Sequence, residues 1–483
     1  MRRATFTAVV LVAALATFTH TFADDPAPLR PYPGTGMFLL LSDIHFDPYD
    51  DPGIMRSLGA VPRDGCRPRP SGAFSNYGVD TNYPLLKSTL DNAVATAATN
   101  GFHYDYVIVT GDFLAHSFDA SYRECVGTDV AAYQKFAGDT IAFVYAAITK
   151  ALPGIPVFAT LGNNDSDQGD YQRPTPAFLE RVGQEWSRTW VRLPAEAGES
   201  ALASFRTAGF YALPHPTAPH DEIVVLNSNL WSANNSAACG DSDPDPGGQF
   251  RWLADVLGHA KHRAGTATLV MHIFPGIDVV KSSMGPPQTF WTDACTGKLI
   301  EKLTQFRGVV REIYAGHIHR DDFRLFPDTN GRPLALIHVV PAVSPVYLNN
   351  PAVQIGWYDR NDGEMRDFAA LYLDLRNPQP AWETEYVFTQ SYGLPRPNLA
   401  AIRGLTRDIH DGNPGSGVGE KFAKYFGAGV SMFLSPANWS EYSCAQTEMI
   451  LSHFTSCTRA RASNVHGERI PYRASGVYPR QSP

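Results

Sequence analysis

Short, mostly apolar runs alternate with helical periodicity along most of the chain. The runs of four to six residues that read as strands stand at 37–41, 106–110, 155–160, 223–227, 268–271 and 309–314. Three stretches between them repeat apolar residues at the spacing of an amphipathic helix, namely 85–98, 132–150 and 249–262. Strands that alternate with helices in this way predict an α/β architecture.

The alternation of strands and helices is interrupted at residues 47–77 and changes again toward the C-terminus. Residues 47–77 are rich in Gly, Pro, Arg and Asp, which predicts a long ordered loop rather than a packed element. Two more strands are predicted at 334–340 and 369–375, and helices and loops follow. We therefore expect a large domain over 37–376 and a mainly helical C-terminal region over 377–483.

The first 23 residues have the pattern of a signal peptide. Arg2 and Arg3 precede an apolar stretch from Ala8 to Phe18, and Thr21-Phe22-Ala23 offers a cleavage site. The alternative is an N-terminal membrane anchor, which the shortness of the apolar stretch disfavours. The Pro-rich segment 24–36 is expected to be a flexible lead-in.

Charge and cysteine content narrow the compartment and the partners. The formal net charge is −8 and the sequence has no long basic run, which disfavours a nucleic-acid duplex or an anionic membrane surface. The six cysteines form no Cys-x-x-Cys pair. In an exported chain they predict up to three disulfides, with Cys444 and Cys457 as one pair. We expect a secreted or extracytoplasmic protein (periplasm, or a lysosome-like or vacuolar lumen) with no stable membrane insertion once the signal peptide is cleaved.

Three sequons match the pattern for N-glycosylation, which matters only in a eukaryotic secretory pathway. They begin at Asn234, Asn438 and Asn164. The third lies among the candidate ligands described next, which disfavours it as a glycosylation site.

Seven side chains that commonly bind metals stand in five clusters, each directly after a predicted strand. They are Asp43, His45, Asp112, Asn163, His272, His317 and His319. In open α/β sheets, binding sites gather at the carboxyl ends of strands, so five strand ends can converge on one crevice. A single Asp-x-His or His-x-His occurs often by chance. Five such clusters in order along the chain indicate a metal site.

The kinds of ligand suggest both the metals and the reaction. Mixed nitrogen and oxygen ligands without thiolate suit zinc, with manganese or iron as alternatives. With about four ligands for each ion and one shared carboxylate, seven residues complete two sites. Two divalent ions roughly 3.5–4 Å apart would activate a bridging water and clamp the oxygens of an in-line displacement at phosphorus.

This set of motifs resembles the calcineurin-like metallophosphoesterase superfamily, and more narrowly the acid sphingomyelinase-like phosphodiesterases. The narrower resemblance rests on the segments that begin at Gly111, Met271, Ala342, Asn349 and Tyr386. It runs from about Met37 to the C-terminus, and the sequence before Met37 is too short for the saposin-like domain of acid sphingomyelinases. The resemblance implies a four-layer αββα sandwich with two mixed sheets.

The resemblance also implies roles for single residues. Asp43, His45, Asp112 and His319 would hold one metal, and Asp112, Asn163, His272 and His317 the other. His116, four residues after the shared carboxylate, would be the general acid that protonates the leaving group. Where relatives have a second His, this chain has Asn164, which can hydrogen-bond a phosphoryl oxygen but cannot act as an acid. The segment Gly162-Asn163-Asn164-Asp165 also resembles the endopolyphosphatase branch.

The leading hypothesis is thus a secreted, monomeric phosphodiesterase in which a metal-bridging hydroxide attacks phosphorus. Its expected substrates are small-molecule phosphodiesters or phosphoanhydrides of the nucleotide or phosphocholine type. The alternatives are an endopolyphosphatase of the same superfamily and a metal-stabilised binding protein with impaired catalysis. A purple acid phosphatase is disfavoured because Ala115 stands where that class has a tyrosine.

Overall fold

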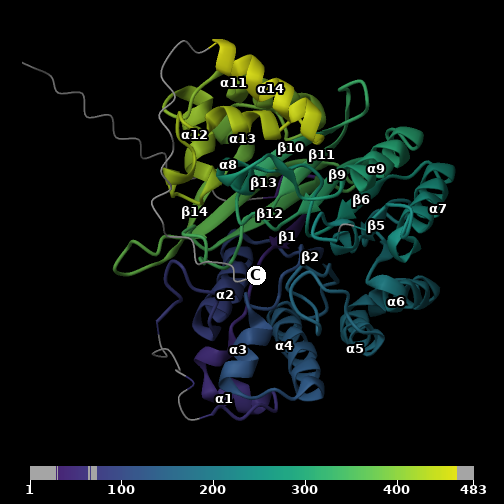
Figure 1. Cartoon of the computed structure of the whole chain (residues 1–483), viewed down its shortest axis with the longest axis vertical. Coiled ribbons are helices and arrows are strands. Elements are labelled where there is room, and N and C mark those ends of the chain that lie inside the picture. The colour runs from purple at the N-terminus through teal and green to yellow at the C-terminus, as the bar shows by residue number, and fades with distance from the viewer. Residues whose placement is uncertain (1–28, 30, 64–65, 67–72, 236, 465–483) are drawn as a thin grey trace, which may run out of the picture.

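Two six-stranded sheets form the centre of the computed structural model, which describes residues 29, 31–63, 66, 73–235 and 237–464 (Figure 1). The first sheet has the order β14-β13-β12-β1-β2-β3. Its strands are β1 (Thr35–Leu41), β2 (Tyr106–Val109), β3 (Val157–Ala159), β12 (Ala352–Asp359), β13 (Met365–Leu373) and β14 (Trp382–Val387). Strands β1, β2 and β3 are parallel, whereas β12 runs antiparallel to β1.

The second sheet is also mixed, in the order β10-β11-β9-β6-β5-β4. Its strands are β4 (Tyr211–Pro214), β5 (Glu222–Val225), β6 (Ala267–Val270), β9 (Val310–Ala315), β10 (Asp322–Pro327) and β11 (Pro333–Val339). The four central strands are parallel, and β10 and β4 are antiparallel edges. Parallel strands β1, β2, β3, β6 and β9 are the ones that the candidate ligands follow.

The two sheets pack face to face, and helices cover their outer faces. Phe38 of β1 meets Tyr314 of β9 with ring centroids 5.7 Å apart, and Phe368 of β13 meets His338 of β11 at 4.5 Å. Helices α2 (Tyr83–Asn100) and α4 (Val130–Ala151) contribute to the core of the first sheet, and α7 (Gln249–His262) and α9 (Asp293–Gln305) to that of the second. The predicted αββα sandwich is confirmed.

The ends of the long helices follow from local chemistry. The Asn82 side chain accepts a hydrogen bond from Leu85 N at the start of α2, and Gly101 ends the helix with φ 70°. Asp129 caps α4 in the same way through Ala132 N. Side-chain capping at the first turn and glycine after the last turn are the usual helix boundaries. The predicted range 85–98 is about four residues shorter than α2, and the predicted range 132–150 is about three residues shorter than α4.

The expectation that 47–77 lacks a packed element is wrong. A 3₁₀ turn η1 (Pro48–Asp50) leads into α1 (Pro52–Ser57), whose Met55 is buried. Asp51 caps α1 by accepting from Gly53 N and Ile54 N, and proline occupies the first turn, where it needs no hydrogen-bond partner. The sequence Asp51-Pro52 is a helix-start signal, but the high Gly and Pro content of residues 47–77 favoured the prediction of a loop.

The first sheet extends beyond the predicted domain boundary at 376, because β14 pairs with β13. The C-terminal region after β14 contains α10 (Phe388–Tyr392), α11 (Leu399–Asp411), α12 (Gly417–Phe426), η5 (Ser431–Phe433), α13 (Trp439–Ala445) and α14 (Leu451–Asn464). This region packs against both sheets: α10 contacts β13 and β14, and α11 contacts β10 and β11. Leu325 N of β10 donates to Gln446 O at 2.8 Å, and Asp321 N donates to Phe426 O at 3.2 Å. Helices α11–α14 lie together at the top of Figure 1, away from α1–α4.

Smaller elements connect these layers. They are α3 (Phe118–Cys125), α5 (Pro176–Trp186), η2 (Ser187–Arg192), α6 (Ala195–Ala208), η3 (Ser228–Trp231), η4 (Pro246–Gly248), β7 (Ile277–Asp278), α8 (Val279–Met284) and β8 (Gln288–Thr289). Strands β7 and β8 form a separate two-stranded antiparallel sheet.

All six cysteines are in disulfides. The pairs are Cys66–Cys125, Cys239–Cys295 and Cys444–Cys457. The predicted Cys444–Cys457 pair is confirmed, and three disulfides fit an extracytoplasmic protein. The predicted signal peptide lies outside the described residues, as do residues 24–28 and 30 of the predicted lead-in. The end of the predicted lead-in is not a flexible segment, because Thr35 and Gly36 already belong to β1.

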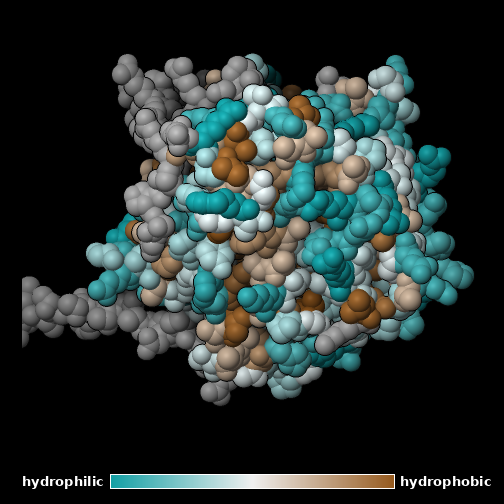
Figure 2. Space-filling view, turned by 90° about the horizontal axis from the view of Figure 1, so that it is seen from below, coloured by the Kyte–Doolittle hydropathy of each residue, from teal (hydrophilic) through white to brown (hydrophobic). Residues whose placement is uncertain are grey.

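None of the described helices has both the length and the apolar composition needed to cross a bilayer. On the face that Figure 2 shows, the described hydrophobic residues stand in small groups among hydrophilic ones. Such scattered apolar residues are normal for a protein surface.

Candidate metal centre

The seven predicted ligands lie on loops that directly follow five parallel strands. Asp43 and His45 follow β1, Asp112 follows β2, Asn163 follows β3, His272 follows β6, and His317 and His319 follow β9. Backbone hydrogen bonds join these loops to one another: Asp43 N donates to Gly111 O at 3.1 Å, His45 N to Asp112 O at 2.9 Å, and Gly316 N to His272 O at 3.0 Å. Across the two sheets, His317 N donates to Asp43 Oδ1 at 3.1 Å, so the loops of both sheets form one connected structure.

Five of the seven ligands have a left-handed backbone, which is uncommon for residues other than glycine. They are Asp43 (φ 46°), His45 (45°), Asp112 (56°), His317 (78°) and His319 (56°). Each such residue costs about 1–3 kcal/mol and persists only where the surroundings fix it. This backbone turns each ligand sharply away from its strand and into the space between the loops.

One group of four ligands meets around a common centre: Asp43, His45, Asp112 and His319. His45 Nε2 lies 3.4 Å from Asp112 Oδ2 and 3.0 Å from His319 Nε2. Asp43 Oδ1 lies 3.3 Å from His319 Nε2 and 3.7 Å from His45 Nε2. The four side chains are buried, each with at most 2% of its surface exposed. This is the group that, by the family resemblance, would hold one metal.

The second group shares Asp112 with the first. His272 Nε2 lies 3.1 Å from Asp112 Oδ2 and 3.1 Å from Asn163 Oδ1. His317 meets the His272 ring edge to face, with centroids 5.2 Å apart, and is the least buried of the seven. Asp112 therefore stands between the two groups, as a bridging carboxylate must.

Two of the four imidazoles are oriented by partners outside the centre. His45 Nδ1 bonds to Leu114 O at 2.9 Å and His272 Nδ1 to Thr110 O at 2.8 Å. Because a carbonyl oxygen can only accept, Nδ1 carries the hydrogen in both rings, and Nε2 is left to bind a proton or a metal ion. The Nε2 atoms of His45 and His319 face each other beside two carboxylates. This donor set fits divalent cations with mixed nitrogen and oxygen ligands.

The electrostatics of the cluster favour positive charge at its centre. Burial alone would lower the pKa of His45, but Asp112 and Asp43 raise it to about 10. Burial likewise opposes Asp112 in raising the pKa of His272, which nevertheless reaches about 9. Burial would raise the pKa of Asp112, yet His272 and His45 hold it well below its usual range. Metal ions could supply the positive charge that these carboxylates attract.

His116 lies at one side of the first group. Its ring stacks on that of His45 with centroids 4.0 Å apart, and its side chain is 23% exposed. Nδ1 bonds to Asp80 Oδ1 at 3.0 Å, and Nε2 faces the Tyr347 hydroxyl at 3.2 Å. Asp80 also accepts from His116 N at 2.8 Å and from Ser344 Oγ at 3.0 Å. A carboxylate on Nδ1 fixes the ring and leaves Nε2 as the atom that can exchange a proton.

Asn164 is bound to the shared carboxylate. Its backbone N donates to Asp112 Oδ1 at 2.9 Å, and its Nδ2 donates to Asp112 Oδ2 at 3.0 Å. Its side chain is thus placed where it steadies Asp112. The next residue, Asp165, accepts from Phe113 N, Leu114 N and Gly162 N, and so joins the loops after β2 and β3.

Three polar residues beside the site were not singled out from the sequence. Asp80 and Tyr347 contact His116, and Asp170 accepts a hydrogen bond from Asn163 Nδ2 at 2.7 Å. Asp80 and Tyr347 are far from His116 along the chain, so no local spacing could reveal them. Asp170 stands seven residues after Asn163 without any periodic signal.

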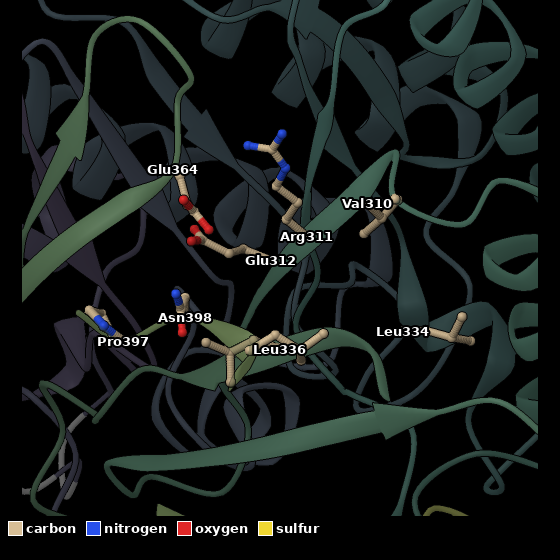
Figure 3. A pocket seen from close by; sticks show the side chains of 10 residues that line it. Val310, Arg311, Glu312, Leu334, Leu336, Glu364, Pro397 and Asn398 are labelled. Atoms are coloured by element: carbon tan, nitrogen blue, oxygen red, sulfur yellow. The ribbon is translucent and has the colours of Figure 1, made fainter. Parts of the chain in front are cut away.

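A separate cavity of about 220 Å³ lies at the other end of β9 (Figure 3). Val310, Arg311 and Glu312 line it at the start of this strand, whereas His317 and His319 follow its end. Burial raises the pKa of Glu312 to about 7, and its carboxylate accepts from Tyr314 Oη at 2.7 Å and from Met365 N at 3.1 Å. This cavity is not part of the ligand cluster.

The chain matches the family model described as calcineurin-like phosphoesterase over residues 36–321, more than half of its length. The chain therefore belongs to the calcineurin-like phosphoesterase family. The match includes all seven candidate ligands, from Asp43 to His319, and the five strand ends that they follow.

Acid sphingomyelinase-like phosphodiesterases are relatives over most of the chain. It is 27% identical to acid sphingomyelinase-like phosphodiesterase 3b of Mus musculus over 394 residues, which cover 77% of this chain and 79% of that protein. It is 25% identical to the cyclic GMP-AMP phosphodiesterase SMPDL3A of Homo sapiens over 421 residues, or 83% and 86% of the two chains. The predicted family resemblance is confirmed.

Solved structures give more distant matches. "Structure of PhoD" matches with a TM-score of 0.42 at 12% identity and covers 74% of this chain and 70% of that one. A dimetal phosphatase from Danio rerio matches with a TM-score of 0.38 at 14% identity, covering 68% and 97%.

The close approach of the loops makes Gly162 a sensitive position. A Cβ added there would overlap the side chain and backbone N of Asp112. We expect Gly162→Ala to displace this carboxylate and to weaken metal binding about 10–100-fold, the loss typical when a ligand's support is removed. Elemental analysis after dialysis against a fixed zinc concentration measures this.

Gly198→Ala is the matched control, because a Cβ there meets nothing within 4 Å and the residue lies inside α6. It should keep the metal content of the wild type. A Gly162→Ala protein that binds as much zinc as the control would contradict the prediction that Asp112 is a metal ligand.

Proposed function

We propose that the protein is a two-metal phosphodiesterase that hydrolyses small phosphodiesters or phosphoanhydrides outside the cytoplasm. The observation that carries the proposal is the Asp112 carboxylate, which lies between two groups of buried nitrogen and oxygen donors. One group would hold one divalent ion through Asp43, His45 and His319, and the other a second ion through Asn163, His272 and His317. Zinc is the expected metal, with manganese or iron as alternatives.

Two bound ions would supply an activated water and would neutralise charge on the phosphoryl oxygens. The protein's own part is to present the ligands rigidly. Backbone hydrogen bonds join the loops, and a carbonyl oxygen on Nδ1 holds the rings of His45 and His272 before any ion binds. Such preorganisation means that little reorganisation is needed during the reaction.

His116 is the proposed general acid. Its Nδ1 is committed to Asp80, and its Nε2 faces the Tyr347 hydroxyl at 3.2 Å. The partly exposed ring stacks on a metal ligand, so a leaving group at the metals would lie within its reach. Proton transfer by a group placed in this way typically contributes about 10²–10⁴-fold to the rate.

The substrate range is inferred from the site and the relatives together. The relatives include proteins named as phosphodiesterases, one of them for cyclic GMP-AMP. Asn164 is bound to Asp112 and cannot protonate a leaving group, so one imidazole acid remains. This favours nucleotide-type or phosphocholine-type diesters and anhydrides whose leaving groups need a single proton.

A hydrolysis screen tests the proposal. Zinc- or manganese-loaded protein is given bis(4-nitrophenyl) phosphate, ATP, CDP-choline, sphingomyelin and polyphosphate. We expect cleavage of at least one small diester or anhydride and a loss of about 100-fold or more in Asp112→Asn, which removes the bridging charge. Exclusive cleavage of polyphosphate would favour the endopolyphosphatase alternative. No cleavage, or an Asp112→Asn protein as active as wild type, would refute the proposal.

The role of His116 predicts a dependence on the leaving group. His116→Ala should lower kcat about 100-fold or more for an ester with an alkyl leaving group, because such a group needs a proton. For a nitrophenyl leaving group, which departs as a stable anion, the loss should be less than about 10-fold. Steady-state kinetics with both substrates measures the difference.

His103→Ala serves as the control, since the His103 side chain is 81% exposed and lies away from the ligand loops. It should leave both rates unchanged. Equal losses for the two leaving groups in His116→Ala would argue against its role as an acid.

A further inference from the structure

The loop after Asn163 folds back and holds this ligand at two points. Asn163 Nδ2 donates to Asp170 Oδ1 at 2.7 Å, and Tyr171 N donates to Asn163 O at 2.8 Å. Two consecutive residues therefore fix both the side chain and the backbone of one ligand. No other ligand of the cluster is a neutral amide.

An amide ligand has an orientation that a carboxylate lacks. Its oxygen can coordinate a cation, whereas its NH₂ group has no lone pair to offer. Asn163 Oδ1 lies 3.1 Å from His272 Nε2, on the side of the shared carboxylate, while Nδ2 points to Asp170. Turning the amide by 180° would set Oδ1 against the Asp170 carboxylate and would present NH₂ to the cation. The Asp170 carboxylate therefore selects the orientation that can bind metal.

The turn itself is strained. Tyr171 has φ 57°, which is unusual for an aromatic residue and is found where the surroundings impose it. Its ring meets that of His317 edge to face, with centroids 6.4 Å apart. The same turn thus contacts Asn163 and His317. Both belong to the second group of ligands, which also contains His272 and shares Asp112 with the first.

We propose that Asp170 is a positioning residue that orients the Asn163 carboxamide and thereby sets the affinity of one metal subsite, that of Asp112, Asn163, His272 and His317. The inference rests on the proposed two-metal function and adds to it that the two subsites depend on different supports. Loss of Asp170 should weaken one ion and spare the other, which Asp43, His45, Asp112 and His319 would hold.

Zinc titration of the metal-free full-length protein by calorimetry tests this. Asp170→Leu should weaken one of two zinc ions about 10–100-fold, the usual effect of losing a ligand's orienting partner. The other ion should stay within about threefold of the wild-type affinity. Asp170→Asn keeps an acceptor oxygen and should lose less than Asp170→Leu, so it serves if the leucine variant fails to fold.

The matched control is Asp167→Asn. Asp167 lies on the same loop but accepts from Thr175 N at 2.9 Å and from Thr175 Oγ1, and not from Asn163. Both zinc affinities should be within about threefold of wild type in this control. If the control loses as much as Asp170→Leu, general loosening of the loop explains the effect and the proposal is wrong.

A double-mutant cycle separates orientation from simple support. Asn163→Asp replaces the amide by a carboxylate whose two oxygens are equivalent, so no partner is needed to orient it. In that background, Asp170→Leu should no longer weaken zinc binding. Additive losses, or two equally weakened ions in Asp170→Leu, would overturn the inference. A wild-type protein that binds fewer than two ions would instead refute the two-metal function.

Discussion

The fold depends at its functional end on one constraint: loops from two different sheets must bring buried carboxylates and imidazoles together in a strained backbone. Five ligands with positive φ, at about 1–3 kcal/mol each, would relax if the loops were independent. Hydrogen bonds from Asp43 N to Gly111 O and from Gly316 N to His272 O join the loops within each sheet. The bond from His317 N to Asp43 Oδ1 joins the two sheets and prevents this relaxation. Glycine at 162 and 316 permits the close approach, because a Cβ at either position would overlap Asp112 or Asp43.

The same constraint explains how charge is distributed. The carboxylates of Asp43 and Asp112 are buried, and the imidazoles around them offset their charge. Unpaired buried charge is costly, so the site favours cations. The groups that tune the site stand one step further out: Asp80 holds His116, Asp165 joins two loops, and Asp170 holds Asn163. Bound metals would determine the class of reaction. The outer groups would orient the proposed acid, His116, and a ligand of the second metal subsite, Asn163.

Much of this could be predicted from sequence, because the ligands follow strands whose apolar runs are continuous and whose carboxyl ends meet. The α/β class, the Cys444–Cys457 disulfide and the family followed from local patterns. Strands β10 and β12 were missed since polar residues such as Arg324 and Gln354 interrupt them, although both are buried and hydrogen-bonded in the fold. Asp80 and Tyr347 could not be found, because only the tertiary fold brings them to His116. Asp321, two residues after His319, accepts hydrogen bonds from Gln354 and Tyr386.

The central claim is that one shared carboxylate divides seven ligands between two ions. Anomalous diffraction from crystals of the zinc-loaded protein tests it most directly. The account predicts two peaks roughly 3.5–4 Å apart on either side of Asp112. One should lie among Asp43, His45 and His319, and the other among Asn163, His272 and His317. A single peak, or zinc bound elsewhere in the chain, would contradict it.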